Sequence, residues 1–558
     1  KGVGKFVSRF VSLAGSIFLD PAWENGTPAL GAIEIVEMSE SGNITVGQNS
    51  ALVLGSQDAD LALNAMNKAG LSLSENGIKS ALYLAKPLNV GNGSIVVDGS
   101  LTSPAEGQSG VVSVAADSLL AVEMTDELAI GSETAITGAS LNLADGSSVL
   151  LAGMEKLTVS DDLSVKLADS VVVGENVNIY GSNGLWYGYG FKDGVITAQY
   201  DPTQLLVDNG LTAPNVTREA LLTNAESAAA LRELINAGDY AGAARWMNQR
   251  ALFASAGAAQ AMTVTISSMV TDTIEQHGSL ISSYSHDKAG VDLWLNVDGL
   301  FTRANSYEAG SSKYGYRADL AGVTFGADYA MGNGLAAGLA VSLGKGNARS
   351  RGEASGIKNK IEYRGLNLYG AWNTQYANVI GSLGYIRSEN NMRSAGLKAK
   401  PDTKALTAAV RVEKDLSIGD AFTVTPHIGA RYSHIKLDNF GTAGFRYSAE
   451  KANLFQIPVG VAVKGNYDAA CGAKVKPFLD LTVSPTMGDK KVSNRFALEG
   501  SSASDSIETR IANTALFNAK FGLEATRGNH SLGVSYGFGA GDKGRIDQAL
   551  QAKYRYVF

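Results

Sequence analysis

The sequence predicts an all-β protein in three consecutive parts: a parallel β-solenoid, a helical linker and an antiparallel β-barrel of twelve strands. Short apolar runs broken by Gly, Asn, Asp and Ser predict the solenoid over residues 1–213. An Ala-rich stretch of low charge predicts the linker over residues 214–286. Alternating runs between short and long connections predict the barrel over residues 287–558. With 558 residues, the chain exceeds the roughly 250–300 residues that one core supports, so several domains are expected.

Composition agrees with an all-β protein and excludes some functions. Only 18% of the residues are charged, and the chain contains 64 Gly and 11 Pro. Residues 1–213 carry 9 Lys and Arg against 24 Asp and Glu, whereas the remainder carries 38 against 30, which indicates two different environments. No basic stripe suited to nucleic acid is present. Cys471 is the single cysteine, so it forms no disulfide within the chain and is expected to be a bystander thiol.

The first part contains strand-like runs of about 4–6 residues whose spacing is too short for helical crossovers, as in stacked solenoid rungs. Examples are the runs 43–47, 51–55, 94–98, 141–145 and 171–175. Residues 58–68 have helical propensity and predict one short helix between rungs.

The linker predicts three helices. The first covers residues 218–235 and ends at the Asn-Ala-Gly sequence 236–238, and the second covers residues 240–250. The third is expected over about 251–276. Residues 251–270 carry no charge, but their many Ser and Thr residues make insertion into lipid unfavourable. A slim helix inside a pore is expected instead, with four small residues that allow close packing: Ala254, Gly257, Ala258 and Ala261.

Twelve alternating runs predict the strands of the last part: 291–301, 320–330, 335–343, 361–372, 377–387, 405–414, 422–434, 454–464, 475–483, 514–525, 531–538 and 546–558. Short connections alternate with long polar ones at 303–319, 344–360, 388–404, 436–452 and 484–510. Short inner turns and long outer loops on an even number of strands are typical of an outer-membrane barrel.

The alternation also predicts which side chains face the lumen. Apolar residues such as Val291, Leu295 and Leu550 fall on the lipid side, and polar residues fall on the other side. The expected lumen residues are Asp292, Asn296, Asp298, Asp328, Arg411, Glu413, His427, Arg431, Asp480, Lys520, Glu524, Lys553 and Arg555. Their charges could hold or guide the helix, or form the ordinary cross-strand pairs of a polar lumen.

The order solenoid, helix, barrel and the end Tyr554-Arg-Tyr-Val-Phe558 resemble the monomeric (type V) autotransporter family with a pertactin-like passenger. The resemblance covers nearly the whole chain. It implies that the solenoid is a right-handed parallel β-helix, the passenger, which the C-terminal barrel and assembly factors deliver to the cell surface. It also implies that Tyr554, Tyr556 and Phe558 form the signal for the barrel assembly machinery and that the helix stays in the lumen.

Some members of this family cleave the passenger at paired asparagines in the pore helix. Here the adjacent pair is Asn390-Asn391, which is expected in an outer loop, and the helix region offers only Asn248-Gln249. The passenger is therefore expected to stay attached.

A catalytic constellation is not expected in the first part, which contains neither His nor Cys. The carboxylates Asp161, Asp162 and Glu175 could serve a glycosidase if they converged across rungs, but solvated turns are the ordinary explanation. The sequence predicts no enzyme, no metal and no cofactor.

Three functions remain for comparison: a surface adhesin or coat protein, the stalk of a passenger whose enzymatic domain lies upstream of residue 1, and a porin. The first is favoured, because an extended solenoid offers side faces for binding. The expected location is the outer membrane, with the passenger on the cell surface. The expected partners are outer-membrane lipid and lipopolysaccharide, the barrel assembly machinery, and a host-surface or self-association partner.

Overall fold

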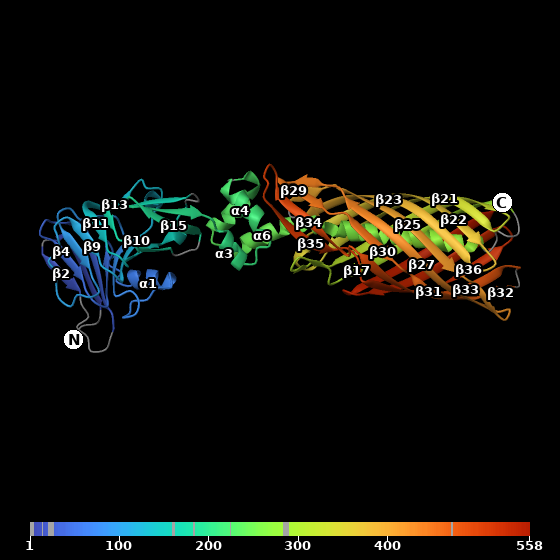
Figure 1. The fold of residues 1–558 in the computed structure, drawn as a ribbon, viewed down its shortest axis with the longest axis horizontal. Coiled ribbons are helices and arrows are strands. Elements are labelled where there is room, and N and C mark those ends of the chain that lie inside the picture. Colours follow the sequence, from blue (N-terminus) through green and yellow to red (C-terminus); the bar gives the residue numbers. More distant parts are fainter. Residues whose placement is uncertain are drawn as a thin grey trace. The chain divides into compact units, whose positions relative to one another are not determined.

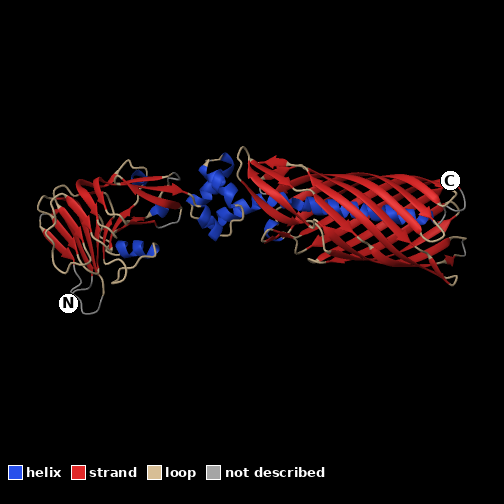
Figure 2. Cartoon of the chain, viewed as in Figure 1, coloured by secondary structure: helices blue, strands red, loops and turns tan. Residues whose placement is uncertain are grey.

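The computed structural model describes residues 5–13, 15–19, 27–158, 162–181, 185–223, 225–282, 289–394, 396–469 and 472–558. The chain divides into two compact units (Figures 1 and 2). The first comprises residues 1–210 with 230–243, and the second comprises residues 211–229 with 244–558. Each unit is described separately.

The first unit is built on two parallel ladders of short strands. One ladder runs in the order β14 (Asn178–Gly181), β12 (Ser148–Ala152), β10 (Ser118–Glu123), β6 (Ser80–Leu84), β5 (Ser50–Leu54), β3 (Ala29–Met38) and β1 (Lys5–Leu13). The other runs in the order β2 (Ser16–Leu19), β4 (Asn43–Val46), β8 (Ser94–Val97), β9 (Val111–Val114), β11 (Thr134–Leu143) and β13 (Leu163–Val173). The short strand β7 (Leu88–Asn89) pairs with β3 and β11.

In-register stacking of apolar side chains explains why these short strands persist. One column consists of Leu52, Leu82, Leu120 and Val149, and a second consists of Ile44, Ile95, Val112 and Leu141. All eight side chains are fully buried. Each rung alone buries little apolar surface, so its stability depends on its neighbours.

A short helix and a pair of antiparallel strands at one end, which we call the antiparallel cap, do not belong to the two parallel ladders. The helix predicted near residues 58–68 is α1 (Leu61–Lys68), whose Ala62 and Met66 pack on the first ladder. At the other end, β16 (Val195–Tyr200) pairs antiparallel with β13 and with β15 (Trp186–Lys192). The sheet is therefore mixed rather than wholly parallel as expected. This arrangement covers the edge of β13 that a further parallel rung would need.

The second unit contains the predicted twelve-strand barrel, which is confirmed. Its strands are β17 (Ala289–Ala304), β20 (Tyr316–Met331), β21 (Leu335–Ser350), β22 (Lys358–Asn373), β23 (Asn378–Ser394), β25 (Asp402–Glu413), β27 (Phe422–Leu437), β30 with β31 (Ala452–Gln456 and Val459–Gly465), β33 (Lys474–Gly488), β36 (Ala515–Arg527), β37 (His530–Gly541) and β38 (Arg545–Val557). Neighbours pair antiparallel, and the pairing of β17 with β38 closes the ring.

Pro458 explains the one divided strand, because proline cannot donate a ladder hydrogen bond. Three further short strands belong to the barrel sheet: β24 (Leu397–Ala399), β26 (Leu416–Ile418) and β32 (Tyr467–Asp468).

The expected long outer loops are largely structured, which corrects the sequence prediction. Six short strands form a second sheet at the long-loop end of the barrel: β19 (Ser312–Lys313), β18 (Glu308–Ala309), β35 (Ser504–Arg510), β34 (Lys491–Leu498), β29 (Phe445–Ala449) and β28 (Phe440–Thr442). We call this the outer sheet. The barrel strands also extend past the predicted ends, as in β21, which reaches Ser350.

The linker helices are α3 (Thr203–Asp208), α4 (Pro214–Leu222), α5 (Ala229–Asn236) and α6 (Tyr240–Leu252). The single helix expected over residues 218–235 is divided by the 3-10 turn η2 (Glu226–Ala228). Another 3-10 segment, η3 (Phe253–Ala258), separates α6 from the long helix α7 (Ala259–Ser282). The lumen helix therefore begins eight residues later than the predicted start at Ala251.

Candidate functional site: the occupied barrel lumen

Helix α7 lies inside the barrel and fills one side of its lumen (Figure 2). It packs against β21, β22, β23, β25 and β27. Two hydroxyl contacts fix it to β25: Thr263 Oγ1 lies 2.5 Å from Thr403 Oγ1, and Ser267 Oγ lies 2.6 Å from Thr407 Oγ1. Ser and Thr suit this position because their hydroxyls bond to the wall without adding charge.

A buried arginine joins the barrel wall to the helix. Arg431 Nη2 on β27 donates to Asp272 Oδ1 at 2.6 Å and to Glu275 Oε2 at 3.3 Å, both on α7. The side chains of Arg431 and Glu275 are 6% and 5% exposed. Since a buried charge without a partner is costly, this contact constrains the position of α7 strongly.

An aromatic and polar cluster surrounds His277 near the inner end of α7. His277 Nε2 lies 2.6 Å from Asp328 Oδ2, and its ring stacks on Trp294 at a centroid distance of 4.3 Å. The hydroxyl of Tyr369 accepts from Trp294 Nε1 at 2.7 Å and donates to Asp328 Oδ2 at 2.9 Å. Four barrel and helix side chains therefore form one buried network.

The other side of α7 faces a polar space. Lys520 Nζ donates to Gln276 Oε1 at 2.5 Å and also to Gln551 Oε1. Gln551 Nε2 donates in turn to Asp298 Oδ1 at 2.6 Å. Nearer the outer end, Arg545 donates to Thr265 Oγ1 at 3.1 Å. Two cavities of about 180 Å³ each adjoin α7 on this side.

The predicted lumen residues are all half-buried or buried, in contrast to lipid-side neighbours such as Leu550, which is 64% exposed. The structure joins many of them in pairs: Arg555 with Asp292, Arg411 with Glu413 and Asp480, His427 with Asp480, and Asn296 with Asp298. Arg431, Asp328, Lys520 and Glu413 contact α7 itself. Glu524 and Lys553 line the inner cavity.

The predicted pore-helix residues lie in two different segments. Ala261 is buried within α7. Ala254, Gly257 and Ala258 belong to η3 instead, and Ala258 has a φ of 53°. A left-handed residue ends a continuous helix, and an uncharged Ala/Ser/Gly stretch gives no sequence signal for that break.

The outer sheet holds the linker. Helix α4 has no capping side chain of its own, but Asp505 on β35 accepts from the backbone N–H of Val216 at 2.8 Å and of Asn215 at 3.3 Å. This carboxylate acts as the N-cap, so it satisfies donors that the helix leaves unpaired. Ser501 Oγ donates to Glu219 Oε1 at 3.1 Å.

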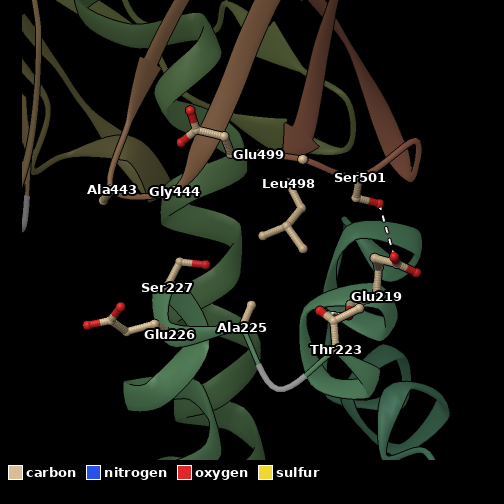
Figure 3. Close-up of a pocket in the computed structure, with 11 residues that line it drawn as sticks. Glu219, Thr223, Ala225, Glu226, Ser227, Ala443, Gly444, Leu498, Glu499 and Ser501 are labelled. Atoms are coloured by element: carbon tan, nitrogen blue, oxygen red, sulfur yellow. Dashed lines mark hydrogen bonds between the residues drawn. The ribbon is translucent and has the colours of Figure 1, made fainter.

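An open groove of about 740 Å³ lies where α4 and η2 meet the outer sheet (Figure 3). Leu498 and the Ser501–Glu219 hydrogen bond lie along it in Figure 3. Its charged lining residues, Glu219, Glu226 and Glu499, are all acidic.

Aromatic contacts fix η3 beneath the outer sheet. The ring of Phe253 meets Tyr447 at 5.8 Å and Phe440 at 6.2 Å, and the Tyr447 hydroxyl donates to the carbonyl of Arg250 at 3.0 Å. The Arg250 guanidinium lies 3.2 Å from the centroid of Trp246. Burial lowers the pKa of Arg250 to about 10, so it remains charged at neutral pH.

The sequence alone did not identify several residues of this site. Asp272, Glu275 and His277 lie at the charged inner end of α7, and Asp505 lies in an expected loop. The three helix residues do carry a signal: they are the first ionisable residues after the uncharged stretch 251–270. Asp505 carries none, because its partner lies 289 residues away along the chain.

The structure also locates the asparagine pair and two of the carboxylates that the sequence analysis considered. Asn390-Asn391 lies within β23 rather than in an outer loop, which corrects the prediction, and buried Asn390 accepts from Asn359. Asp162 accepts from the backbone of Tyr200 at 3.0 Å, while Glu175 follows the opposite end of β13. At about 3.3 Å per residue, this strand keeps the two carboxylates farther apart than the roughly 5–10 Å of glycosidase pairs. Cys471 and Asp161 lie outside the described residues.

Within the part of the chain that the structure describes, no helix combines the length and hydropathy needed to cross a membrane. The lipid-side band of apolar residues and the polar, helix-filled interior define a transmembrane β-barrel of the outer-membrane class. Residues 293–537 match the family model of the autotransporter beta-domain. Most of the barrel thus matches the autotransporter beta-domain family, and the match supports a location in the outer membrane.

Two curated relatives are similar over part of the chain. Outer membrane protein A of Rickettsia rickettsii is 26% identical over 180 residues, which are 29% of this chain and 8% of that protein. Outer membrane protein A of Rickettsia conorii (strain ATCC VR-613 / Malish 7) is 23% identical over 259 residues, which are 41% of this chain and 12% of that protein. The matched regions thus span only about a tenth of these relatives.

Solved autotransporter barrels are also similar. The transport unit of AIDA-I from Escherichia coli has a TM-score of 0.39 and 12% identity, and the match covers 48% of this chain and 90% of that one. The translocator domain of NalP from Neisseria meningitidis has a TM-score of 0.39 and 14% identity over 53% of this chain and 98% of that one. The beta domain of Bordetella BrkA has a TM-score of 0.37 and 17% identity over 49% of this chain and 100% of that one.

Proposed function

We propose that this chain comprises the translocator barrel of an autotransporter and a stretch of its passenger, which the barrel displays on the cell surface as an adhesin or surface coat. The observation that carries the proposal is the course of α7. This helix precedes β17 and occupies the lumen of a closed barrel, so the chain before it leaves the barrel at the outer end. A soluble or periplasmic role for residues 1–213 does not account for that course.

The parallel ladders support a binding role for the passenger. We propose that they are the rungs of a right-handed parallel β-helix. Such a solenoid stacks one rung on another, and its sides offer an extended surface for a host ligand or a second copy. No enzymatic role is proposed for residues 1–213, and no metal or cofactor is assigned.

Helix α7 supports the idea that the barrel anchors the passenger after export. Its contacts with Arg431, Asp328 and Lys520 join it to three separate strands. A segment held in this way resists withdrawal and also obstructs free flow through the pore. The porin hypothesis is therefore less favoured.

Surface display can be tested on intact cells. External protease should remove residues 1–210 and leave a protected fragment containing α7 and the barrel, detected with antibodies against each part. The control is the same treatment after permeabilisation, which exposes periplasmic marker proteins. Residues 1–210 that become digestible only after permeabilisation would refute display.

Adhesin and coat functions differ in their partner. Cells of a non-adherent Gram-negative host that express the chain should bind host cells if the passenger is an adhesin, or aggregate with one another if it self-associates. A matched control carries the barrel and α7 without residues 1–210. If neither behaviour depends on these residues, the adhesin and coat roles are wrong and the stalk hypothesis replaces them.

The proposed partner for assembly is the barrel assembly machinery, through the aromatic end of the chain. Phe558 is 66% exposed on the lipid side, and its ring lies 4.6 Å from that of Tyr556. Replacing Phe558 with Asp should reduce the heat-modifiable barrel in outer membranes, whereas replacing it with Leu should be tolerated. Normal accumulation of the Asp variant would exclude this signal.

A further inference from the structure

The space beside α7 is unevenly charged, and its inner cavity is the most cationic part. That cavity, of about 180 Å³, is lined by Lys476, Lys520, Glu524, Lys553 and Arg411 among others. We call it the lysine cavity. The second cavity continues from it toward Arg545 and shares Gln276, Arg411, Asp480, Lys520 and Gln551 with it.

The side chains that line the lysine cavity carry five positive charges, on Arg411, Lys464, Lys476, Lys520 and Lys553, against three carboxylates, Asp415, Asp480 and Glu524. Lys464 lies 3.5 Å from Asp415, and Arg411 is paired with Glu413 and Asp480. Among the described residues, Lys520 and Lys553 form no ion pair with a carboxylate, and Lys520 donates only to two glutamine oxygens.

Glu524 is the remaining carboxylate of the lining. It lies opposite Lys476 in the β33–β36 register and cannot balance three lysines. The lining therefore keeps an excess of positive charge.

We propose that the lysine cavity is a binding site for a small oxyanion of the phosphate type. Unpaired ammonium groups in a confined polar space attract anions more strongly than they would in bulk water. Ser279, Ser535 and Gln551 line the same space but donate to Glu413, Gln551 and Asp298, so the lysine ammonium groups are the donors to the oxyanion. The closed ring of strands excludes lipid headgroups, so the ligand is a free anion.

The two ends of the lumen indicate where the anion enters. Residues of the inner ends of the strands, such as Thr423, Lys464 and Asn466, belong to the lining of the lysine cavity. At the outer end, the space between η3, the start of α7 and the wall is only about 10 Å³. The anion therefore reaches its site from the periplasmic side.

The test uses the full chain, folded in detergent micelles, and inorganic phosphate as the probe. Isothermal titration at low ionic strength should show saturable binding at about one site. The double variant Lys520→Gln, Lys553→Gln should lower the affinity at least about tenfold, because it removes two charged donors. The matched control Lys400→Gln removes an exposed lysine at the outer end and should leave the affinity unchanged.

Misfolding alone would also abolish phosphate binding, so the test includes a variant that should bind phosphate more tightly. Glu524→Gln removes a carboxylate from the lining and should tighten phosphate binding several-fold, while the folded barrel remains heat-modifiable. No saturable binding to the wild type, or equal binding by the double lysine variant, would overturn the proposal. Unchanged or weaker binding by a folded Glu524→Gln variant would overturn it as well.

Discussion

Arg431 shows how one buried side chain can hold a helix inside a barrel. Its guanidinium reaches two carboxylates of α7, and one of them, Glu275, is almost fully buried. Taking charges out of water is costly, so the pair contributes little net stability when intact. Removing one partner is strongly unfavourable, because the other charge stays buried.

We therefore predict that Arg431→Met destabilises the folded barrel by about 3 kcal/mol. Adding Glu275→Gln to that variant should restore part of the loss, since it removes the unpaired buried carboxylate. The measurement is the temperature or urea concentration at which the heat-modifiable band disappears. Arg364→Met is the matched control, because Arg364 is 64% exposed on the outer face of the barrel and its pair with Glu389 is not buried in the lumen. Equal effects of Arg431→Met and Arg364→Met would contradict the prediction.

Buried tyrosines indicate the alkaline pH range in which the first unit should unfold. Burial raises the pKa of Tyr189 and of Tyr200 to about 12, and burial together with a hydrogen bond to Glu123 raises the pKa of Tyr83 further. A raised folded-state pKa gives stability that is fully present below the unfolded pKa of about 10 and is lost as the pH rises above it.

Residues 1–210 should accordingly unfold as the pH rises from about 10 to 12. Circular dichroism and tyrosinate absorbance should change together over this range. Tyr83→Phe removes one of these groups and should make the transition less steep, although it also removes the bond to Glu123. Tyrosine ionisation that is complete near pH 10 without unfolding would show that these hydroxyls are accessible to water.

At the scale of the element, a glycine sets how closely α7 approaches the wall. A Cβ on Gly278 would lie 2.5 Å from Cγ2 of Ile380, a fully buried residue of β23. The β-branched Ile380 has little freedom to move in a packed interior. Gly278→Ala should therefore displace α7 from β23 and raise the ion conductance of the barrel in planar bilayers.

Two further variants make that prediction specific. Adding Ile380→Ala to Gly278→Ala should return the conductance toward the wild-type value, since it makes room for the new methyl group. Gly381→Ala adds a methyl group to the same strand where nothing lies within 4 Å, and it should leave the conductance unchanged. A conductance that stays at the wild-type value in Gly278→Ala would show that α7 can shift without opening the lumen.

The sequence predicts the elements of this barrel better than their ends. All twelve strands are predictable because lipid on one side and a polar lumen on the other impose a period of two residues. Beyond the membrane both faces meet water, so the period disappears, although β21 and β23 continue for seven residues past their predicted ends. For the same reason, the outer sheet was not predictable.

The side chains of the lumen are likewise predictable only in part. The alternation assigns charged residues to the interior, but it does not indicate which of them meet α7 and which pair across strands. That choice depends on the rotation and depth of α7, which the uncharged sequence before Asp272 leaves undetermined. The start of α7 was misplaced because Ser, Gly and Ala in η3 fit a helix and a 3-10 turn almost equally well.

At the scale of the whole molecule, the first unit should differ in stability along its ladders. The rungs from β8 to β14 and the antiparallel cap β15–β16 form one connected region that ends close to residue 200. The cap covers the edge of β13 and provides a fixed end for the stack. Rungs of a solenoid propagate from a stable neighbour, so this region should fold first and resist unfolding longest.

Limited proteolysis of residues 1–213 should therefore leave a resistant fragment close to residues 95–213. Mass spectrometry of the fragments over time checks this expectation. As a control, Trp186→Ala removes the ring that meets Tyr200 at 5.4 Å, and it should shorten the lifetime of that fragment. Rapid loss of the fragment while residues 1–90 survive would reverse the proposed order.

The hydroxyl contacts between α7 and β25 recur every four residues on both elements, with Thr263 at Thr403 and Ser267 at Thr407. A translation of α7 by four residues, about 6 Å, would bring Ser267 to Thr403 and Thr271 to Thr407. Each position would again find a hydroxyl partner. The hydroxyl contacts alone therefore do not distinguish the observed position of α7 from one displaced outward by four residues.

The ion pairs of Arg431 distinguish the observed position of α7 from the displaced one. The same translation would bring Gln276 and Ser279, both neutral, to Arg431 in place of its two carboxylates. Only one depth of the helix therefore satisfies both kinds of contact. A further outward step of four residues would keep two hydroxyl contacts but would carry Asp272 and Glu275 past Arg431, so the ion pairs hold the helix at its present depth. In the proposed export, the first charges that follow the uncharged residues 251–271 would thus determine where the chain comes to rest.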